Sequence, residues 1–217
     1  MTSHESRLLP ALAVLTVPIF LAFLPGRYLL MPKGIPILAG ASLAISMLAT
    51  GFFPASVLLR SVERYTALVI LPLAMGVQVV LVAALLIDMA KPHSGFGGLT
   101  LLTTSVAIWA NNIILFALAY WQLDRGGPTG RTTGSHGRAD FTFPRGDPSD
   151  GVPTDWQPVF ADYFYLAFNT ATAFSPTDVL PLTPRAKMLM MTESFISLLT
   201  VVAIGARAIN ILGSGTR

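Results

Sequence analysis

The chain is built from long apolar stretches separated by shorter polar segments. A membrane-spanning helix needs about 20 mainly apolar residues, because lipid offers no hydrogen-bond partner to backbone groups outside a helix. Five stretches meet this requirement, at residues 7–24, 35–59, 65–90, 101–122 and 184–210. The pattern therefore predicts an all-α integral membrane protein with five transmembrane helices.

Local signals indicate where these helices end. The first stretch has the layout of a signal peptide, but no small-x-small cleavage site follows it, so we interpret it as an uncleaved span. Pro54 is expected to kink the end of the second span, and the charged segment 60–64 is expected to form a tight connection to the third. Tyr120 and Trp121 end the fourth span and are expected to mark a membrane interface.

The segment 123–158 has a different composition, rich in Gly, Pro, Ser, Thr, Asp and Arg. It shows no apolar periodicity, which is typical of a solvated linker, and its middle part, 126–137, is expected to be disordered. The three spans before residue 91 form an N-terminal membrane region, residues 1–91. The remainder, residues 92–217, forms a second module that holds helix 101–122, this linker, a short segment at 160–183 and the last helix, 184–212.

Composition narrows the chemistry of the chain. Hydrophobic residues make up 53% of it and charged residues only 12%, which is typical of membrane proteins. The absence of cysteine excludes disulfides and thiolate nucleophiles. The three histidines have no zinc-type spacing, and neither GxSxG nor HExxH occurs. We therefore expect no enzyme activity and no cofactor, and the scattered arginines give nucleic-acid binding little support.

A short segment before the last span has a different pattern. Residues 160–172 have Phe164, Ala167, Phe168 and Ala171 at three- and four-residue spacing, which predicts a helix with these residues on its apolar face. At about 1.5 Å per residue this helix covers about 20 Å, well short of the roughly 30 Å hydrocarbon core. A helix that enters a membrane without crossing it, followed by non-helical chain, is the pattern of a re-entrant pore loop.

The sequence from Phe164 to Lys187, FYLAFNTATAFSPTDVLPLTPRAK, resembles the pore helix, filter and following turn of tetrameric potassium channels. Their filter reads T-T-V-G-Y-G-D and is followed by a hydrophobic pair, Pro, any residue and Thr. Thr172 matches the first threonine and Asp178 the aspartate without a gap, and 179–183 continues in register. The resemblance covers about residues 101–212. It implies a two-helix pore module in a homotetramer in the lipid bilayer, with inorganic cations as the permeating species and the last helix as inner gate.

The five-span layout also resembles that of uncharacterised bacterial membrane proteins with an equivalent loop that lacks glycine. This second resemblance implies a multi-pass protein of the bacterial plasma (inner) membrane. The first three spans lie outside the channel resemblance, and they lack the regular arginine ladder of a voltage sensor.

The loop departs from the potassium-filter pattern where the backbone matters most. Ser175 and Thr177 occupy the two glycine positions that let successive carbonyls turn toward the ion. Pro176 stands for the tyrosine and deletes a backbone N–H, and Ala173 replaces the second threonine. The predicted loop comprises Thr172, Ala173, Phe174, Ser175, Pro176, Thr177 and Asp178. We expect a wider or partly hydrated cation path; the alternative is a non-conducting structural or partner-binding protein that retains a channel scaffold.

Four polar residues within apolar helices are further candidates. Glu193 lies about two turns into the last span, where a charge costs on the order of 3 kcal/mol, so it should face the helix bundle, a cavity or a polar partner. Asn111, Asn112 and Asn169 are candidate partners for it. Each of these residues is either a pore contact or a structural hydrogen bond between helices. Arg207, near the end of the span, is expected to extend to the interface.

The membrane orientation that the resemblance implies conflicts with the distribution of positive charges. A channel-like topology places the linker and the N-terminus outside and the C-terminus inside. Arginine and lysine are normally enriched inside. Four lie inside, Arg27, Lys33, Lys91 and Arg217, against seven outside, Arg7, Arg60, Arg64, Arg125, Arg131, Arg138 and Arg145. Without the four linker arginines, which a long segment carries with little effect, the count is four to three for the channel topology.

Overall fold

Helices dominate the computed structural model, which describes residues 6–90, 98–133, 137–144, 156–172 and 178–214. The elements in chain order are α1 (Leu8–Ala22), η1 (Gly26–Tyr28), α2 (Gly34–Phe52), α3 (Val57–Ala90), α4 (Gly98–Leu123), η2 (Asp124–Gly126), α5 (Gly127–Thr133), β1 (Phe141–Thr142), α6 (Phe160–Thr172), β2 (Leu180–Pro181) and α7 (Pro184–Ser214). The all-α class predicted from the sequence is confirmed.

Four of the described helical segments are long and apolar enough to cross a membrane. They are Gly34–Phe52, Val57–Ala90, Gly98–Arg131 and Pro184–Ile209. The predicted first span is helical as α1, but this apolar helix has only 15 residues. By length and composition, then, four of the five predicted spans are present.

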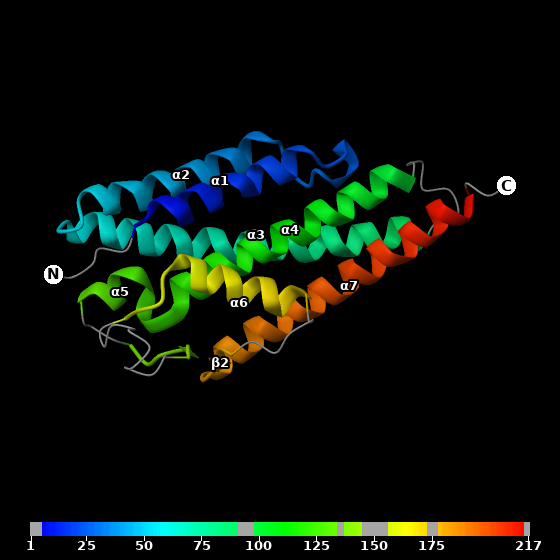
Figure 1. Cartoon of the computed structure of the whole chain (residues 1–217). Helices are drawn as coiled ribbons and strands as arrows, with labels where there is room; N and C mark the ends of the chain where they lie inside the picture. Colours follow the sequence, from blue (N-terminus) through cyan, green and yellow to red (C-terminus); the bar gives the residue numbers. More distant parts are fainter. Residues whose placement is uncertain (1–5, 91–97, 134–136, 145–155, 173–177, 215–217) are drawn as a thin grey trace.

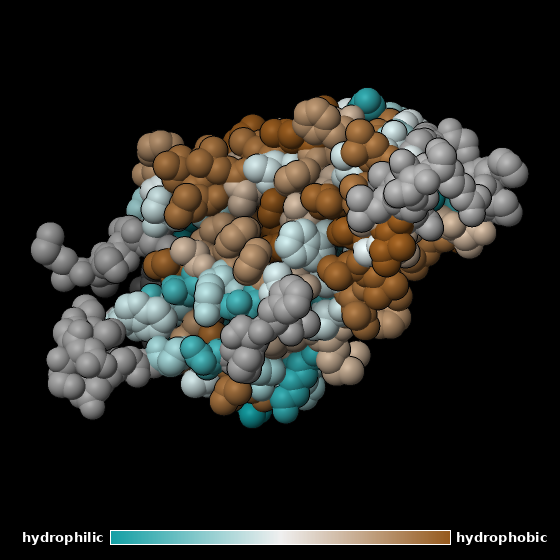
Figure 2. Space-filling view, turned by 45° about the vertical axis from the view of Figure 1, so that its right-hand side comes forward, coloured by the Kyte–Doolittle hydropathy of each residue, from teal (hydrophilic) through white to brown (hydrophobic). Residues whose placement is uncertain are grey.

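Helix α4 lies at the centre of the molecule (Figure 1). It contacts α1 and α3 on one side and α6 and α7 on the other. Of its most apolar part 61% is buried, against 28–33% for the other three candidate spans. Figure 2 shows apolar side chains over much of the visible face, with hydrophilic ones gathered in its lower part. The apolar outer surface of these helices suits contact with lipid hydrocarbon.

The connection between the second and third spans differs from the prediction. Helix α2 ends at Phe52, before Pro54, and α3 begins at Val57, so the charged segment 60–64 is helical. The Ser56 hydroxyl accepts a hydrogen bond from the backbone N–H of Leu59 and starts the helix. Two of the charges, Glu63 and Arg64, have partners elsewhere in the fold. Glu63, for example, is buried 3.5 Å from Arg7.

The linker is more ordered than its composition predicts. Part of the segment 126–137, where disorder is expected, forms the short helix α5, and β1 follows. Arg131 of α5 donates hydrogen bonds to the backbone oxygens of Trp121 (2.9 Å) and Asp124 (3.1 Å). Its guanidinium also lies over the rings of Trp121 and Tyr163, 5.8 and 5.1 Å from their centroids. Because its partners come from α4 and α6, this cation fastens α5 to the helix bundle.

The aromatic pair at the end of α4 does not mark the molecular surface. Tyr120 and Trp121 are both 0% exposed. Tyr120 packs edge-on against Phe141 of β1 at 5.1 Å between ring centroids, and Trp121 packs against Phe160 of α6 at 6.0 Å. Both rings therefore pack inside the protein, covered by the linker and α6, and do not form an exposed aromatic belt.

Candidate functional site

Helix α6 begins beside the end of α4 and runs back along it. At its start, the Tyr163 hydroxyl donates a hydrogen bond to Asp124 Oδ2 at 2.6 Å. Further along α6, the ring of Phe168 lies 6.4 Å from the ring of Trp109. Trp109 lies on α4, roughly four helical turns before the end of that helix. Helix α6 is therefore antiparallel to α4 and ends at the level of the middle of that helix.

The bounds predicted for this short helix are confirmed, but its buried face is only partly as predicted. Ala167 and Ala171 are buried, whereas Phe164 and Phe168 are 40% and 43% exposed. The fully buried positions include Tyr163 and Leu166 instead. The difference arises because α6 packs on both α4 and α7, which rotates its buried side toward the tyrosine whose hydroxyl meets Asp124.

The predicted loop lies largely outside the described residues, since Ala173, Phe174, Ser175, Pro176 and Thr177 fall there. Its two ends are described. The Thr172 hydroxyl donates to the backbone oxygens of Phe168 (3.0 Å) and Asn169 (3.2 Å), and so closes the last turn of α6. Asp178 at the other end is exposed, and the following Val179 is buried.

A two-stranded strap joins the linker to the chain that follows this loop. Strands β1 and β2 are antiparallel, with Phe141 opposite Pro181 and Thr142 opposite Leu180. The strap is extended by a hydrogen bond of 2.8 Å from the backbone N–H of Leu182 to the backbone carbonyl oxygen of Asp140. The chain therefore re-enters the fold beside the linker, before α7 begins.

Asp140 clamps this strap onto the first turn of α7. Its carboxylate accepts hydrogen bonds from Arg185 Nε at 2.6 Å and Arg185 Nη2 at 2.5 Å, and another from the Thr183 hydroxyl. The same hydroxyl accepts the backbone N–H of Ala186 at 3.3 Å, as an N-cap of α7 does. Asp140 is 1% exposed, so this carboxylate is a buried anchor.

Asp124 performs the same task at the start of α6. One carboxylate oxygen accepts the Tyr163 hydroxyl, and the other accepts the backbone N–H groups of Asp140 (2.8 Å) and Phe141 (3.3 Å). Asp124 is itself 0% exposed. Two buried aspartates thus hold both ends of the segment that contains α6 and the predicted loop.

Glu193 is buried inside the helix bundle, as predicted, but with a different partner. Its Oε2 accepts the Tyr120 hydroxyl at 2.5 Å, and the residue is 0% exposed. Asn112 donates to the Ser197 hydroxyl at 3.0 Å and to the Glu193 backbone oxygen at 3.4 Å. Among the described residues, Glu193 Oε1 has no hydrogen-bond partner. This network of hydrogen bonds joins α4 to α7.

The other two asparagines do not join this network. Asn111 donates to Gln78 Oε1 at 2.8 Å and so links α4 to α3. Asn169 on α6 is 9% exposed, and its Nδ2 has no hydrogen-bond partner in the described part of the chain. Of the predicted polar residues, the fold brings together Glu193 and Asn112, and it separates Asn111 from them.

Sequence reasoning missed five polar residues that frame the site. They are Tyr120, Asp124, Asp140, Tyr163 and Arg185. One weak signal was present, since Asp124 directly follows an apolar span, at the edge of the hydrocarbon region. The pairing of Asp140 with residues 43 and 45 positions later has no local signature.

The fold and its apolar helices define this chain as an all-α, multi-pass, membrane-embedded protein. Within the described residues, no group of three or more histidine, aspartate or glutamate side chains is placed to hold a metal ion. Comparison with protein-family models, with curated proteins and with solved structures finds no match.

Proposed function

We propose that this protein is one subunit of a homotetrameric, pore-loop cation channel in a bacterial plasma membrane. In this proposal α6 is a re-entrant pore helix, residues 172–178 line the path of partly hydrated cations, and α7 forms the inner gate. The supporting observation is the course of the chain around α6. It leaves the level of Asp124, reaches the level of Trp109 and returns to a strap that is tied to Asp124 again.

The length of α6 supports this course through a membrane. Its 13 residues span about 20 Å, less than the roughly 30 Å of a hydrocarbon core. A chain that ends a helix there needs either protein or a water-filled cavity around its next residues. The two aspartate clamps fix both ends of this segment, as a loop that selects ions by geometry requires.

Assembly into a tetramer follows from the number of loops in each chain. One loop cannot enclose a path, so several subunits must meet on a common axis. The outer sides of α6 and α7 offer apolar surface for such contacts. Tyr165 is 54% exposed on α6, and Phe195 and Leu198 on α7 are 63% and 61% exposed. The proposal also counts α1 as a fifth membrane helix, because α1 packs along both α2 and α4.

One observation favours the alternative, a non-conducting protein that keeps this scaffold. Glu193, the only acid within the last span, is bonded to Tyr120 and fully buried in the subunit. It therefore joins helices and does not face an open path. In this alternative the loop is a structural plug or a partner-binding element.

Cysteine labelling tests the re-entrant course, since the native chain has no cysteine. Ala161→Cys and Leu180→Cys place single thiols at exposed positions before and after the loop. The proposal predicts that a membrane-impermeant maleimide labels both from the same side of sealed vesicles. Labelling from opposite sides would mean that α6 crosses the membrane and would end the proposal.

Cation flux into proteoliposomes tests conduction. Thr172→Val should reduce the flux several-fold, because it removes a hydroxyl from the end of the proposed path that adjoins α6. Thr192→Val is a matched control, since both hydroxyls bond to the carbonyl four residues earlier in their own helix, at 3.0 and 2.8 Å. Equal flux in both variants would contradict the role of Thr172 in the path. Flux no greater than in protein-free liposomes, or a monomeric mass for the purified protein, would favour the non-conducting alternative.

A further inference from the structure

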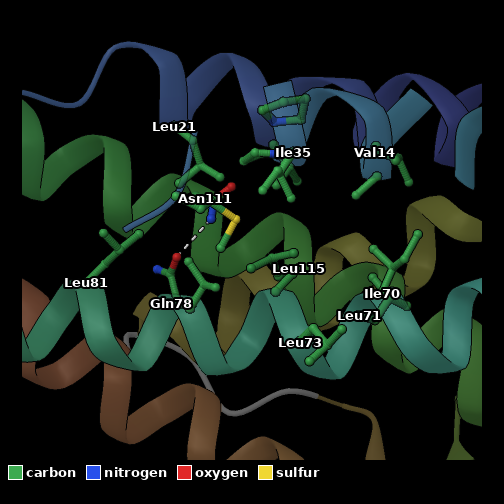
Figure 3. Close-up of a pocket in the computed structure, with 18 of the residues that line it drawn as sticks. Val14, Leu21, Ile35, Ile70, Leu71, Leu73, Gln78, Leu81, Asn111 and Leu115 are labelled. Carbon is green, nitrogen blue, oxygen red and sulfur yellow. Dashed lines mark hydrogen bonds between the residues drawn. The ribbon is translucent and has the colours of Figure 1, made fainter. Parts of the chain in front are cut away.

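A second site lies between helices α1, α2, α3 and α4, on the side of α4 away from α6. It is a cavity of about 290 Å³ whose lining is almost entirely apolar (Figure 3). This volume is at the low end of the roughly 300–1,000 Å³ found for small-molecule pockets. None of the described residues that line it belongs to α6 or α7, so this proposal does not rest on the proposed channel function.

Two buried amides, Gln78 and Asn111, lie against the wall of this cavity. Gln78 Nε2 donates to the backbone oxygen of Ile108 at 2.6 Å, and Gln78 Oε1 accepts from Asn111 Nδ2 at 2.8 Å. A carbonyl can only accept, so the Ile108 oxygen fixes the orientation of the Gln78 amide, and this in turn fixes that of Asn111. The network therefore determines which side-chain atom of Asn111 is left without a hydrogen-bond partner.

That atom is Asn111 Oδ1, a hydrogen-bond acceptor. It has no hydrogen-bond partner among the described residues, although Asn111 is only 3% exposed. Figure 3 shows this oxygen pointing away from Gln78, toward Leu21 and Ile35 across the cavity. Buried polar groups normally have partners, so a lone acceptor aimed into an apolar space calls for a donor from outside the chain.

The mouth of the cavity lies on the apolar outer face of the protein. Three of its lining residues are largely exposed: Leu30 at 48%, Ile35 at 51% and Leu73 at 66%. A molecule that enters past these side chains comes from the hydrocarbon region of a bilayer. Because the described lining residues include no charged side chain, ionic ligands are not matched, and Asn111 Oδ1 offers an uncharged ligand one hydrogen bond.

We propose that this cavity binds an uncharged, membrane-dissolved alcohol or phenol. Its hydroxyl donates to Asn111 Oδ1, and its hydrocarbon body fills the space between the α1–α2 pair and α3. The hydroxyl supplies the hydrogen bond that Asn111 Oδ1 lacks, and the body buries apolar surface on both sides.

Binding of 1-naphthol to the full-length protein in lipid nanodiscs tests this assignment, with empty nanodiscs subtracted. The result expected is saturable binding, with naphthalene and 1-methoxynaphthalene competing at least about tenfold more weakly because neither donates a hydrogen bond. This comparison uses the unaltered chain, so it does not depend on any variant folding. Equal competition by all three compounds, or no saturable binding, would overturn the proposal.

Variants then locate the site. Asn111→Leu should weaken 1-naphthol binding about tenfold while leaving naphthalene binding unchanged. Ala74→Phe fills the cavity from α3 and should abolish binding, whereas Ala83→Phe, at an exposed position of the same helix outside the cavity, should bind as the unaltered chain does. Binding that survives Ala74→Phe would place the ligand elsewhere and refute the assignment.

Discussion

Replacing Asp140 by alanine should loosen the clamp that holds the chain after the predicted loop. The change removes the acceptor of the buried Thr183 hydroxyl and of two N–H groups of Arg185. A hydrogen bond to a charged group contributes about 1.5–3 kcal/mol, but an exposed ion pair contributes only about 0.2–1 kcal/mol. Since the Arg185 side chain is 54% exposed, the buried Thr183 bond should dominate.

The expected loss for Asp140→Ala is about 2–4 kcal/mol in the free energy of unfolding. For a chain of this size that corresponds to a fall of about 4–16 °C in Tm, measured by thermal unfolding of the purified protein in detergent. Arg185→Met should cost less, about 1–2 kcal/mol, because the Arg185 side chain is 54% exposed but its loss leaves the buried Asp140 carboxylate with the Thr183 hydroxyl. Thr183→Val should cost at least as much as Asp140→Ala, because it removes the same buried hydrogen bond and also the N-cap of α7.

The order of these three variants is the test. If Arg185→Met costs as much as Asp140→Ala, the ion pair with Arg185 and not the buried hydroxyl bond carries the clamp. If Asp140→Ala leaves Tm unchanged, the strap does not hold the start of α7, and the reasoning fails.

Three further outcomes follow from other parts of the fold. Gly127→Ala should lower the free energy of unfolding by about 1–3 kcal/mol, because φ is +84° and the new Cβ would lie 2.8 Å from a backbone oxygen. Gly126→Ala should cost less, since φ is +79° there but the space around the new Cβ is open. Equal shifts in Tm for the two variants would contradict this reasoning. Tyr120→Phe should lower the free energy of unfolding by about 1–2 kcal/mol, because it removes the hydrogen bond to Glu193. In a Glu193→Leu background the same change should cost almost nothing. Additive costs in unfolding measurements would show that the two groups are not coupled. Burial raises the pKa of Tyr28 to about 12, so the neutral phenol stabilises the fold below pH about 10, and this stability is lost as the pH rises toward 12. The difference in Tm between the native chain and Tyr28→Phe should therefore change between pH 10 and 12. A constant difference in Tm would refute this prediction.

The elements best predicted from the sequence are those whose signals are local. Helix α6 has the predicted bounds because its apolar residues follow the helical repeat. Helix α7 begins at Pro184, as expected of a residue suited to a first turn. Helix α4 ends at Leu123, one residue beyond the predicted end, since the composition changes abruptly there.

The elements that were missed depend on partners far away in the chain. The charged segment 60–64 looks like a turn until Glu63 is seen beside Arg7. The segment 126–137 looks disordered until Arg131 is seen against the end of α4. Glu193 was correctly expected to need a partner, but nothing in a single sequence distinguishes Tyr120 from the three asparagines. Pairing of this kind is set by packing, which local patterns do not contain.

The most direct test of the proposed function is the reversal potential of the purified protein in planar bilayers with asymmetric KCl. The channel proposal predicts a conductance whose reversal potential lies toward the potassium equilibrium potential, with Asp178→Asn moving it toward zero because a negative charge at the mouth of the path is lost. A membrane that stays as silent as a protein-free bilayer, or a reversal potential on the chloride side, would contradict the proposal.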